Sequence, residues 1–264
     1  MTATIYNSRR LATAYAFHRP SVHRGIIAAL ANHISFAHRP VRALDIGCGA
    51  GLSTAALESL AEFLIGLEPV EAMLMHRRAV APNACFVVGQ AEQLPFAEQS
   101  FDLMTAAGAL NYADLDRFFP EAARVLTPDG VLVIYDFSEG RRLRDDARLE
   151  HWYAEFKRRW TSPPGYAMDV RQLTYQNYGL RLTAYEELEI AVPMTLESYL
   201  LYAMSETNIE QAIARGESED AIREWCRATL AEIFKDNPRE VFFDAYFACV
   251  ERVGTATSRE RGLS

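Results

Sequence analysis

The sequence predicts an α/β protein with a doubly wound, seven-stranded and mostly parallel sheet whose last strand is antiparallel, and with a helical cap. Short apolar runs at 41–46, 63–68, 101–107 and 131–137 alternate with segments of helical period, as in βαβ units. The first run ends in glycines at alternate positions, which is typical of a strand that turns sharply into a helix. The second half is longer than two closing strands require, and therefore predicts extra helices.

Composition narrows the class of protein. The chain has 264 residues, of which 50% are hydrophobic and 23% charged, as expected for one large globular domain or a domain with a cap. The net charge of −8 argues against a nucleic-acid partner, which favours a basic surface. Four scattered cysteines are expected to be reduced, and no apolar run is long enough to span a membrane. We therefore expect a cytoplasmic protein without a membrane or nucleic-acid partner.

The glycine turn carries the first functional signal. Gly47, Gly49 and Gly51 allow a tight turn that a ligand can approach, but no Gly-Lys-Ser/Thr follows, which excludes a P-loop. Asp45 lies just before the glycines, where it would repel a pyrophosphate and suit an ammonium or sulfonium cation. Glu68 ends the next strand, where an acid binds ribose hydroxyls in this fold class. These residues favour S-adenosylmethionine (SAM) over NAD.

Five segments carry a resemblance to one family. They are 44–51 (LDIGCGAG), 66–69 (GLEP), 89–96 (GQAEQLPF), 100–103 (SFDL) and 124–130 (RVLTPDG). In order and spacing, this set resembles the small-molecule class I SAM-dependent methyltransferases, with a Rossmann-like fold, over about residues 40–137. The resemblance implies SAM as cofactor and S-adenosylhomocysteine (SAH) as product.

The resemblance, together with the glycine and acid positions, gives the expected site. The segment 15–20 (YAFHRP) loosely matches a lid of the form Tyr-x-x-x-Arg-Pro that approaches the SAM carboxylate, although it could equally be a packed helix. Met73 is expected against the adenine or, as readily, in the core. The expected cofactor-binding residues are Tyr15, Arg19, Asp45, Gly47, Cys48, Gly49, Glu68, Pro69, Met73, Gln90, Ala91, Glu92, Ala107, Gly108 and Asn111.

Candidate catalytic groups are chosen by their expected nearness to the transferred methyl. They are Tyr112, His18 and His151, with Tyr175, Tyr178, Tyr202 and Glu206 as further possible bases. A base is helpful but not obligatory, because methyl transfer depends chiefly on positioning the nucleophile and excluding water. Asp136, at the end of the fifth strand, is expected to be a helix cap or a surface acid. The strand ends offer no carboxylate cluster, so no metal is expected.

The expected organisation has four parts. Residues 1–39 form N-terminal helices and a lid, and residues 40–140 form the SAM-binding core. Residues 141–178 and 193–238 form a helical substrate cap, because the latter segment is too long for a structureless loop. Residues 179–192 and 239–253 supply the last two strands. Helices are expected over 52–61 and 169–178, among others, and a strand over 83–89.

Three functional hypotheses follow. The first is a SAM-dependent methyltransferase acting on an O, N or C nucleophile of a hydrophobic small molecule, in specialised metabolism. The second uses the same SAM pocket for a non-methylating reaction such as cyclisation or decarboxylation. The third, a non-catalytic SAM-binding regulatory module, predicts a degraded glycine loop, whereas this loop is intact. The oligomeric state is left open.

Overall fold

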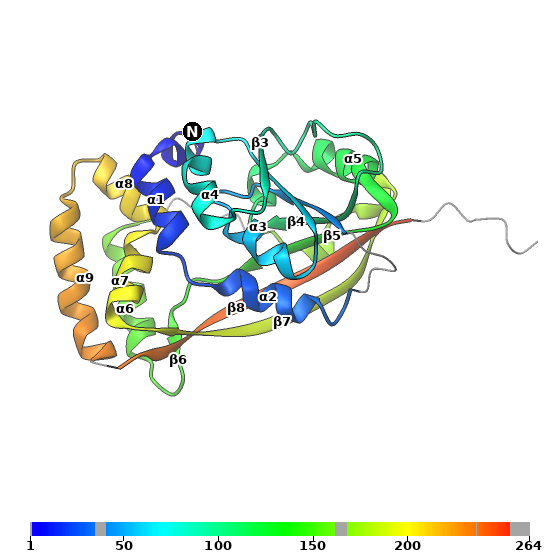
Figure 1. Ribbon diagram of the computed structural model, residues 1–264. Helices are drawn as coiled ribbons and strands as arrows, with labels where there is room; N and C mark the ends of the chain where they lie inside the picture. Colours follow the sequence, from blue (N-terminus) through cyan, green and yellow to red (C-terminus); the bar gives the residue numbers. More distant parts are fainter. Residues whose placement is uncertain (1, 35–40, 162–167, 236, 254–264) are drawn as a thin grey trace, which may run out of the picture.

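A computed structural model describes residues 2–34, 41–161, 168–235 and 237–253. Its centre is one sheet in the order β3-β2-β1-β4-β5-β8-β6, with β7 also paired to β8 (Figure 1). The strands are β1 (Arg42–Ile46), β2 (Phe63–Glu68), β3 (Cys85–Val88), β4 (Phe101–Ala107), β5 (Leu126–Phe137), β6 (Arg142–Leu143), β7 (Leu180–Met194) and β8 (Arg239–Arg252). The expected α/β fold class is confirmed.

The chain runs parallel from β1 to β5 and reverses at β8. Strands β1 to β5 pair in parallel, whereas β8 is antiparallel to β5, β6 and β7. The described sheet has eight strands rather than the expected seven. The addition is the two-residue β6, which can form because β8 pairs with β5 only over residues 245–251 and extends beyond it.

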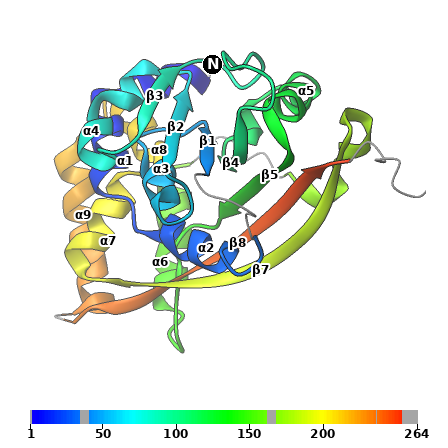
Figure 2. The same cartoon turned by 45° about the vertical axis from the view of Figure 1, so that its right-hand side comes forward.

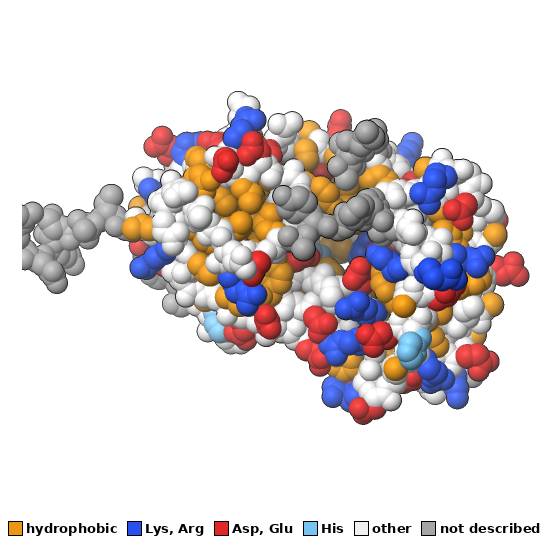
Figure 3. Space-filling model, turned by 180° about the vertical axis from the view of Figure 1, so that it is seen from behind, with side chains coloured by type: hydrophobic (Ala, Val, Ile, Leu, Met, Phe, Trp, Pro, Cys, Tyr) orange, Lys and Arg blue, Asp and Glu red, His pale blue; other side chains and the backbone are white. Residues whose placement is uncertain are grey.

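The helices lie on both faces and at one end of the sheet (Figure 2). They are α1 (Arg9–Phe17), α2 (Val22–Leu30), α3 (Leu52–Ala56), α4 (Arg77–Val80), α5 (Leu115–Val125), α6 (Arg148–Arg159), α7 (Leu196–Met204), α8 (Thr207–Ala214) and α9 (Glu219–Phe234). Helices α6 to α9 gather at one end, on the left of Figure 1, where β7 ends and β8 begins. That end carries interspersed basic and acidic side chains, on the right of Figure 3.

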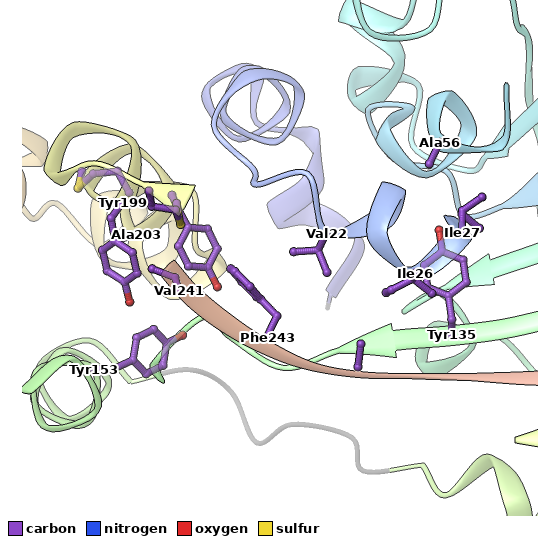
Figure 4. Packing of buried hydrophobic residues seen from close by; sticks show 14 of the residues in the cluster. Val22, Ile26, Ile27, Ala56, Tyr135, Tyr153, Tyr199, Ala203, Val241 and Phe243 are labelled. Atoms are coloured by element: carbon purple, nitrogen blue, oxygen red, sulfur yellow. The ribbon is translucent and has the colours of Figure 1, made fainter. Parts of the chain in front are cut away.

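Alternation along β5 separates two cores. Val133 and Tyr135 face the α2, α3 and cap side, whereas Leu132 and Ile134 face α5. Because successive side chains of a strand point to opposite faces, one apolar strand serves both cores. Figure 4 shows the first core continuing from α2 to the side chains of α7 and β8. The cap therefore shares its core with the sheet.

Three expected segments differ in the structure. The helix expected over 52–61 is α3 followed by a 3-10 turn at Leu57–Ser59, and the strand expected over 83–89 is only Cys85–Val88. The expected helix over 169–178 is two 3-10 turns, Val170–Gln172 and Tyr175–Tyr178. These turns pack on α5 rather than with α6 to α9, since Tyr175 lies edge-on to Phe119 at 5.2 Å. The expected cap segment 141–178 is thus divided between two faces.

Candidate functional site

The glycine turn after β1 has the backbone that its glycines predict. Gly47, Gly49 and Gly51 have φ angles of 63°, 54° and 97°, which side-chain-bearing residues rarely adopt. The amide of Cys48 donates to the carbonyl of Leu67 at 3.1 Å, which joins the turn to β2. The turn therefore lies at the carboxyl ends of β1 and β2, where this class of sheet binds ligands.

A second loop presses against the turn from β4. A methyl group placed on Gly47 would lie 2.6 Å from the Cβ of Ala109, closer than two carbons can approach. A methyl group on Gly49 would meet only the Cε of Met73, at 3.7 Å. Gly47 is therefore required by the loop beside it, whereas a methyl group on Gly49 would make only an ordinary contact with Met73.

Asp45 holds the turn from beneath. Its carboxylate is fully buried and accepts hydrogen bonds from Ser53 Oγ at 2.6 Å, Thr54 Oγ1 at 2.7 Å and Thr105 Oγ1 at 2.8 Å. Burial raises the pKa of this carboxyl, and the three hydroxyl donors oppose that rise. The sequence predicts that Asp45 lies directly against a cationic ligand. The structure instead surrounds it with hydroxyls, so its first effect is on the shape of the turn.

Glu68 joins the turn to the end of β2. Its Oε2 accepts from the amide of Gly49 at 2.9 Å, and its Oε1 accepts from the amide of Val70 at 3.0 Å. Burial raises the pKa of this carboxyl. A carboxylate has about four acceptor positions, so the two that remain can accept a pair of ribose hydroxyls. These free acceptor positions beside the glycine turn fit the ribose of SAM.

The other expected cofactor residues surround this turn at different depths. Met73 is buried, with its Cε 3.7 Å from where a methyl group on Gly49 would lie, whereas Pro69 and Gln90 are exposed. Glu92 Oε1 accepts from the amide of Asp114 at 2.8 Å, which anchors the loop after β3 to the start of α5. The remaining members, Cys48, Ala91, Ala107, Gly108 and Asn111, lie in the loops or strand ends that follow β1, β3 and β4.

The sequence predicts that Asp136 is a helix cap or a surface acid, but the structure places its partly buried side chain against Gly108. A methyl group on Gly108 would lie 3.1 Å from Asp136 Oδ1, so the ends of β4 and β5 meet here. Burial raises the pKa of Asp136. A carboxyl at the end of β5, beside a glycine at the end of β4, is the sequence signal that could have identified it. The structure adds it to the candidate site.

The N-terminal segment packs against two loops that follow strands of the sheet. Helix α1 packs along the 3-10 turn Glu71–His76, where Thr13 Oγ1 lies 2.9 Å from His76 Nε2 and Phe17 contacts the same ring. The hydroxyl of Tyr6 lies 3.1 Å from that of Tyr112. The segment therefore spans from the loop after β2 to the loop after β4.

Arg19 connects this segment to the cap. Its guanidinium pairs with Glu206 at 3.0 Å, donates to the carbonyl of Ser205 at 3.1 Å and lies over the ring of Tyr15, 4.3 Å from its centre. Neighbouring acidic groups raise the pKa of Arg19 against the opposing effect of burial. Tyr15 and Arg19 therefore lie together, and the described hydrogen-bond partners of Arg19 are in the cap.

The three expected catalytic residues are not brought together. Tyr112 is 61% exposed beside Tyr6, and His151 is exposed on α6. His18 lines a cavity of about 310 Å³ between α1, α7 and α9, where burial lowers its pKa. Of these three, only Tyr112 lies in a loop that follows a parallel strand, so the structure gives no common site for the set.

No group of three His, Cys, Asp or Glu side chains in the described ranges is arranged to hold a metal ion. Within the same ranges, no helix has the length and apolar character needed to cross a bilayer.

Comparison with known proteins bears on the same region. Residues 44–134 match a family model described as "Methyltransferase domain". A malonyl-[acyl-carrier protein] O-methyltransferase of Methylococcus capsulatus is 36% identical over 135 residues, which cover 48% of this chain and 44% of that protein. The chain spans 37% to 48% of the length of this and other curated relatives.

Two solved structures share the fold over most of the chain. A provisional type II methyltransferase of Anaeromyxobacter dehalogenans has a TM-score of 0.64 at 22% identity, covering 88% of this chain and 96% of that one. The [4+2]-cyclase SpnF has a TM-score of 0.52 at 18% identity, covering 88% and 81%. At these identities the likeness concerns the fold alone.

Proposed function

We propose that this chain, a member of the class I SAM-dependent methyltransferase family through its residues 44–134, transfers a methyl group to a hydrophobic small molecule. The observation that carries the proposal is the Glu68 carboxylate. It holds the amide of Gly49 and keeps two acceptor positions for a ribose at the carboxyl ends of β1 and β2. The adjoining helical cap is the proposed substrate side.

Bound SAM would supply an electrophilic methyl for in-line displacement by an O, N or C nucleophile. The chain's own residues then have three tasks: to orient the nucleoside, to position the acceptor and to exclude water. Glu68 and the glycine turn serve the first task. The N-terminal segment, whose Tyr6 hydroxyl contacts that of Tyr112, is proposed to close one side of the site and so to help exclude water.

Asp136 is the carboxyl we propose beside the reacting centre. It lies next to Gly108 at the end of β4, and burial raises its pKa, which brings a carboxyl closer to the range useful for accepting a proton. We therefore place it ahead of His18 and His151 as a candidate base.

The test is calorimetry with SAM and SAH, followed by mass spectrometry of an extract of the source organism incubated with enzyme and SAM. We expect both ligands to bind and one extract component to gain the mass of a methyl group. Binding with a product of unchanged mass would favour a non-methylating reaction such as cyclisation or decarboxylation. Absence of binding would overturn the proposal.

A further inference from the structure

One tyrosine of the cap has a buried hydroxyl without a partner. Tyr153, on α6, is 3% exposed, and its Oη finds no hydrogen bond in the part of the chain that is described. Two neighbouring tyrosines of α7 are satisfied: Tyr199 donates to the carbonyl of Gly140 at 2.7 Å, and Tyr202 accepts from its amide at 3.2 Å. A buried polar atom left unpaired costs stability, so its presence calls for an explanation.

Arg19 presents a second buried donor at the same junction. Its Nη atoms are used by Glu206 and Ser205, whereas its Nε has no partner among the described residues. Arg19 lies over the ring of Tyr202, 5.5 Å from its centre, and Tyr202 and Tyr153 belong to the same buried cluster. In Figure 4 the hydroxyl of Tyr153 points away from α6, toward Phe243 and the α7 side chains.

The surroundings indicate which ligand these donors suit. The guanidinium lies between the rings of Tyr15 and Tyr202, 4.3 and 5.5 Å from their centres, so the junction is largely aromatic. Glu206 already neutralises the charge of Arg19 at 3.0 Å. A carboxylate ligand would add a second buried negative charge to one guanidinium, whereas a neutral carbonyl oxygen has two lone pairs for two donors.

We propose that Tyr153 and Arg19 form a subsite that binds the carbonyl oxygen of a neutral, aromatic or otherwise hydrophobic acceptor. The proposal rests on the proposed function in one respect, because it treats this junction as the acceptor's side of the site. The subsite requires a polar contact between Tyr153 of α6 and the ligand. This requirement is the same whichever reaction the bound ligand undergoes.

The first test compares Tyr153→Phe with the matched control Tyr199→Phe by thermal unfolding without ligand. Tyr199→Phe removes a partnered hydroxyl and should lower the melting temperature. Tyr153→Phe removes an unpartnered hydroxyl and should leave the melting temperature unchanged or raise it. An equal loss in both variants would show that Tyr153 is satisfied within the fold, and would overturn the proposal.

The second test measures probe binding by NMR titration, with and without saturating SAH. The probes are acetophenone, benzoate and ethylbenzene, which share a ring and differ in the oxygen acceptor. We expect acetophenone to bind more tightly than the other two, and Tyr153→Phe to weaken only acetophenone, by about three- to tenfold. Equal binding of all three probes, or an unchanged acetophenone affinity in the variant, would refute the subsite.

The two proposals fail separately. SAH binding is measured on the same samples by calorimetry and depends on the glycine turn. If SAH does not bind while acetophenone binds in a Tyr153-dependent way, the proposed methyltransferase function is wrong and the subsite stands. If SAH binds and the acetophenone result is negative, only the subsite is overturned.

Discussion

Substitution of Gly47 by alanine tests the contact between the two loops of the candidate site. Two costs add at this position. The φ angle of 63° is left-handed, which costs an L-residue about 1–2 kcal/mol. The added methyl also meets the Cβ of Ala109 at 2.6 Å, and such overpacking costs about 1–3 kcal/mol. We therefore expect Gly47→Ala to lower the free energy of unfolding by about 2–5 kcal/mol.

Gly179 offers a matched control. Its φ angle is 68°, and a methyl group placed on it has no other atom within 4 Å. Gly179→Ala should therefore show the backbone cost alone, about 1–2 kcal/mol. The assay is urea unfolding of both variants at pH 7, read as the change in unfolding free energy.

A double-mutant cycle separates the two costs. Ala109→Gly in the Gly47→Ala background removes the clash but not the backbone strain, so it should recover the excess over Gly179→Ala. If Gly47→Ala costs no more than Gly179→Ala, or if Ala109→Gly recovers nothing, the two loops do not touch as described. The reasoning about the shape of the site would then be refuted.

Three further predictions concern charged groups. Burial raises the folded-state pKa of Asp45, so the wild type should gain stability relative to Asp45→Asn as the pH falls through the raised pKa toward 3.8. The measurement is urea unfolding of both proteins over this pH range. A difference in unfolding free energy that does not change with pH would contradict the prediction. Glu68→Gln keeps one amide contact and loses the other, so it should lower the free energy of unfolding by about 1.5–3 kcal/mol and weaken SAH binding in calorimetry. The control Glu92→Gln can keep its one contact and should change neither quantity. Equal effects of the two substitutions would count against the ribose assignment. Arg19→Met and Glu206→Gln should each lower the free energy of unfolding by about 3–5 kcal/mol, because each change leaves a mostly buried charge unpaired. The double variant should lose less than the sum of the two single losses. Additive losses in urea unfolding would disprove the coupling.

Much of the sheet and of the glycine turn could be predicted because their signals are local. An apolar run followed by alternating glycines defines a strand and a turn within about ten residues, and Glu68 follows at the end of the next run. These positions need no knowledge of distant contacts. The ends of the elements were predicted less accurately. Helix α3 ends at Ala56 and is followed by a 3-10 turn, which the helical pattern through residue 61 does not indicate.

The environment of Asp45 could not be predicted, because it depends on residues far along the chain. One partner, Thr105, lies 60 residues away on β4 and reaches Asp45 only after β1 and β4 pair. Ser53 and Thr54 are nearer, but their hydroxyls face inward only once α3 turns over the sheet. The pattern indicates an acid before the glycines, and not the direction in which it points.

The cap was harder still, because its partners come from separate segments. Residues 170–178 follow α6 in sequence, yet they pack on α5, since Val170 and Tyr175 share a core with Phe118 and Phe119. Tyr153 gave no signal in an ordinary amphipathic stretch. Its importance depends on a comparison with Tyr199 and Tyr202, which only the folded contacts with Gly140 allow.

The three carboxyl groups of the candidate site share one electrostatic feature. Asp45, Glu68 and Asp136 all have pKa values raised first by burial, and none of them forms an ion pair within the described residues. Buried carboxylates without a counter-ion favour a cationic ligand, because a nearby positive charge stabilises their ionised form. The sequence assigned that attraction to Asp45 alone. The structure encloses Asp45 in hydroxyls, whereas the carboxyls of Glu68 and Asp136 have no hydroxyl donor among the described residues. We therefore expect the positive charge of a bound ligand to lie nearer to Glu68 and Asp136 than to Asp45.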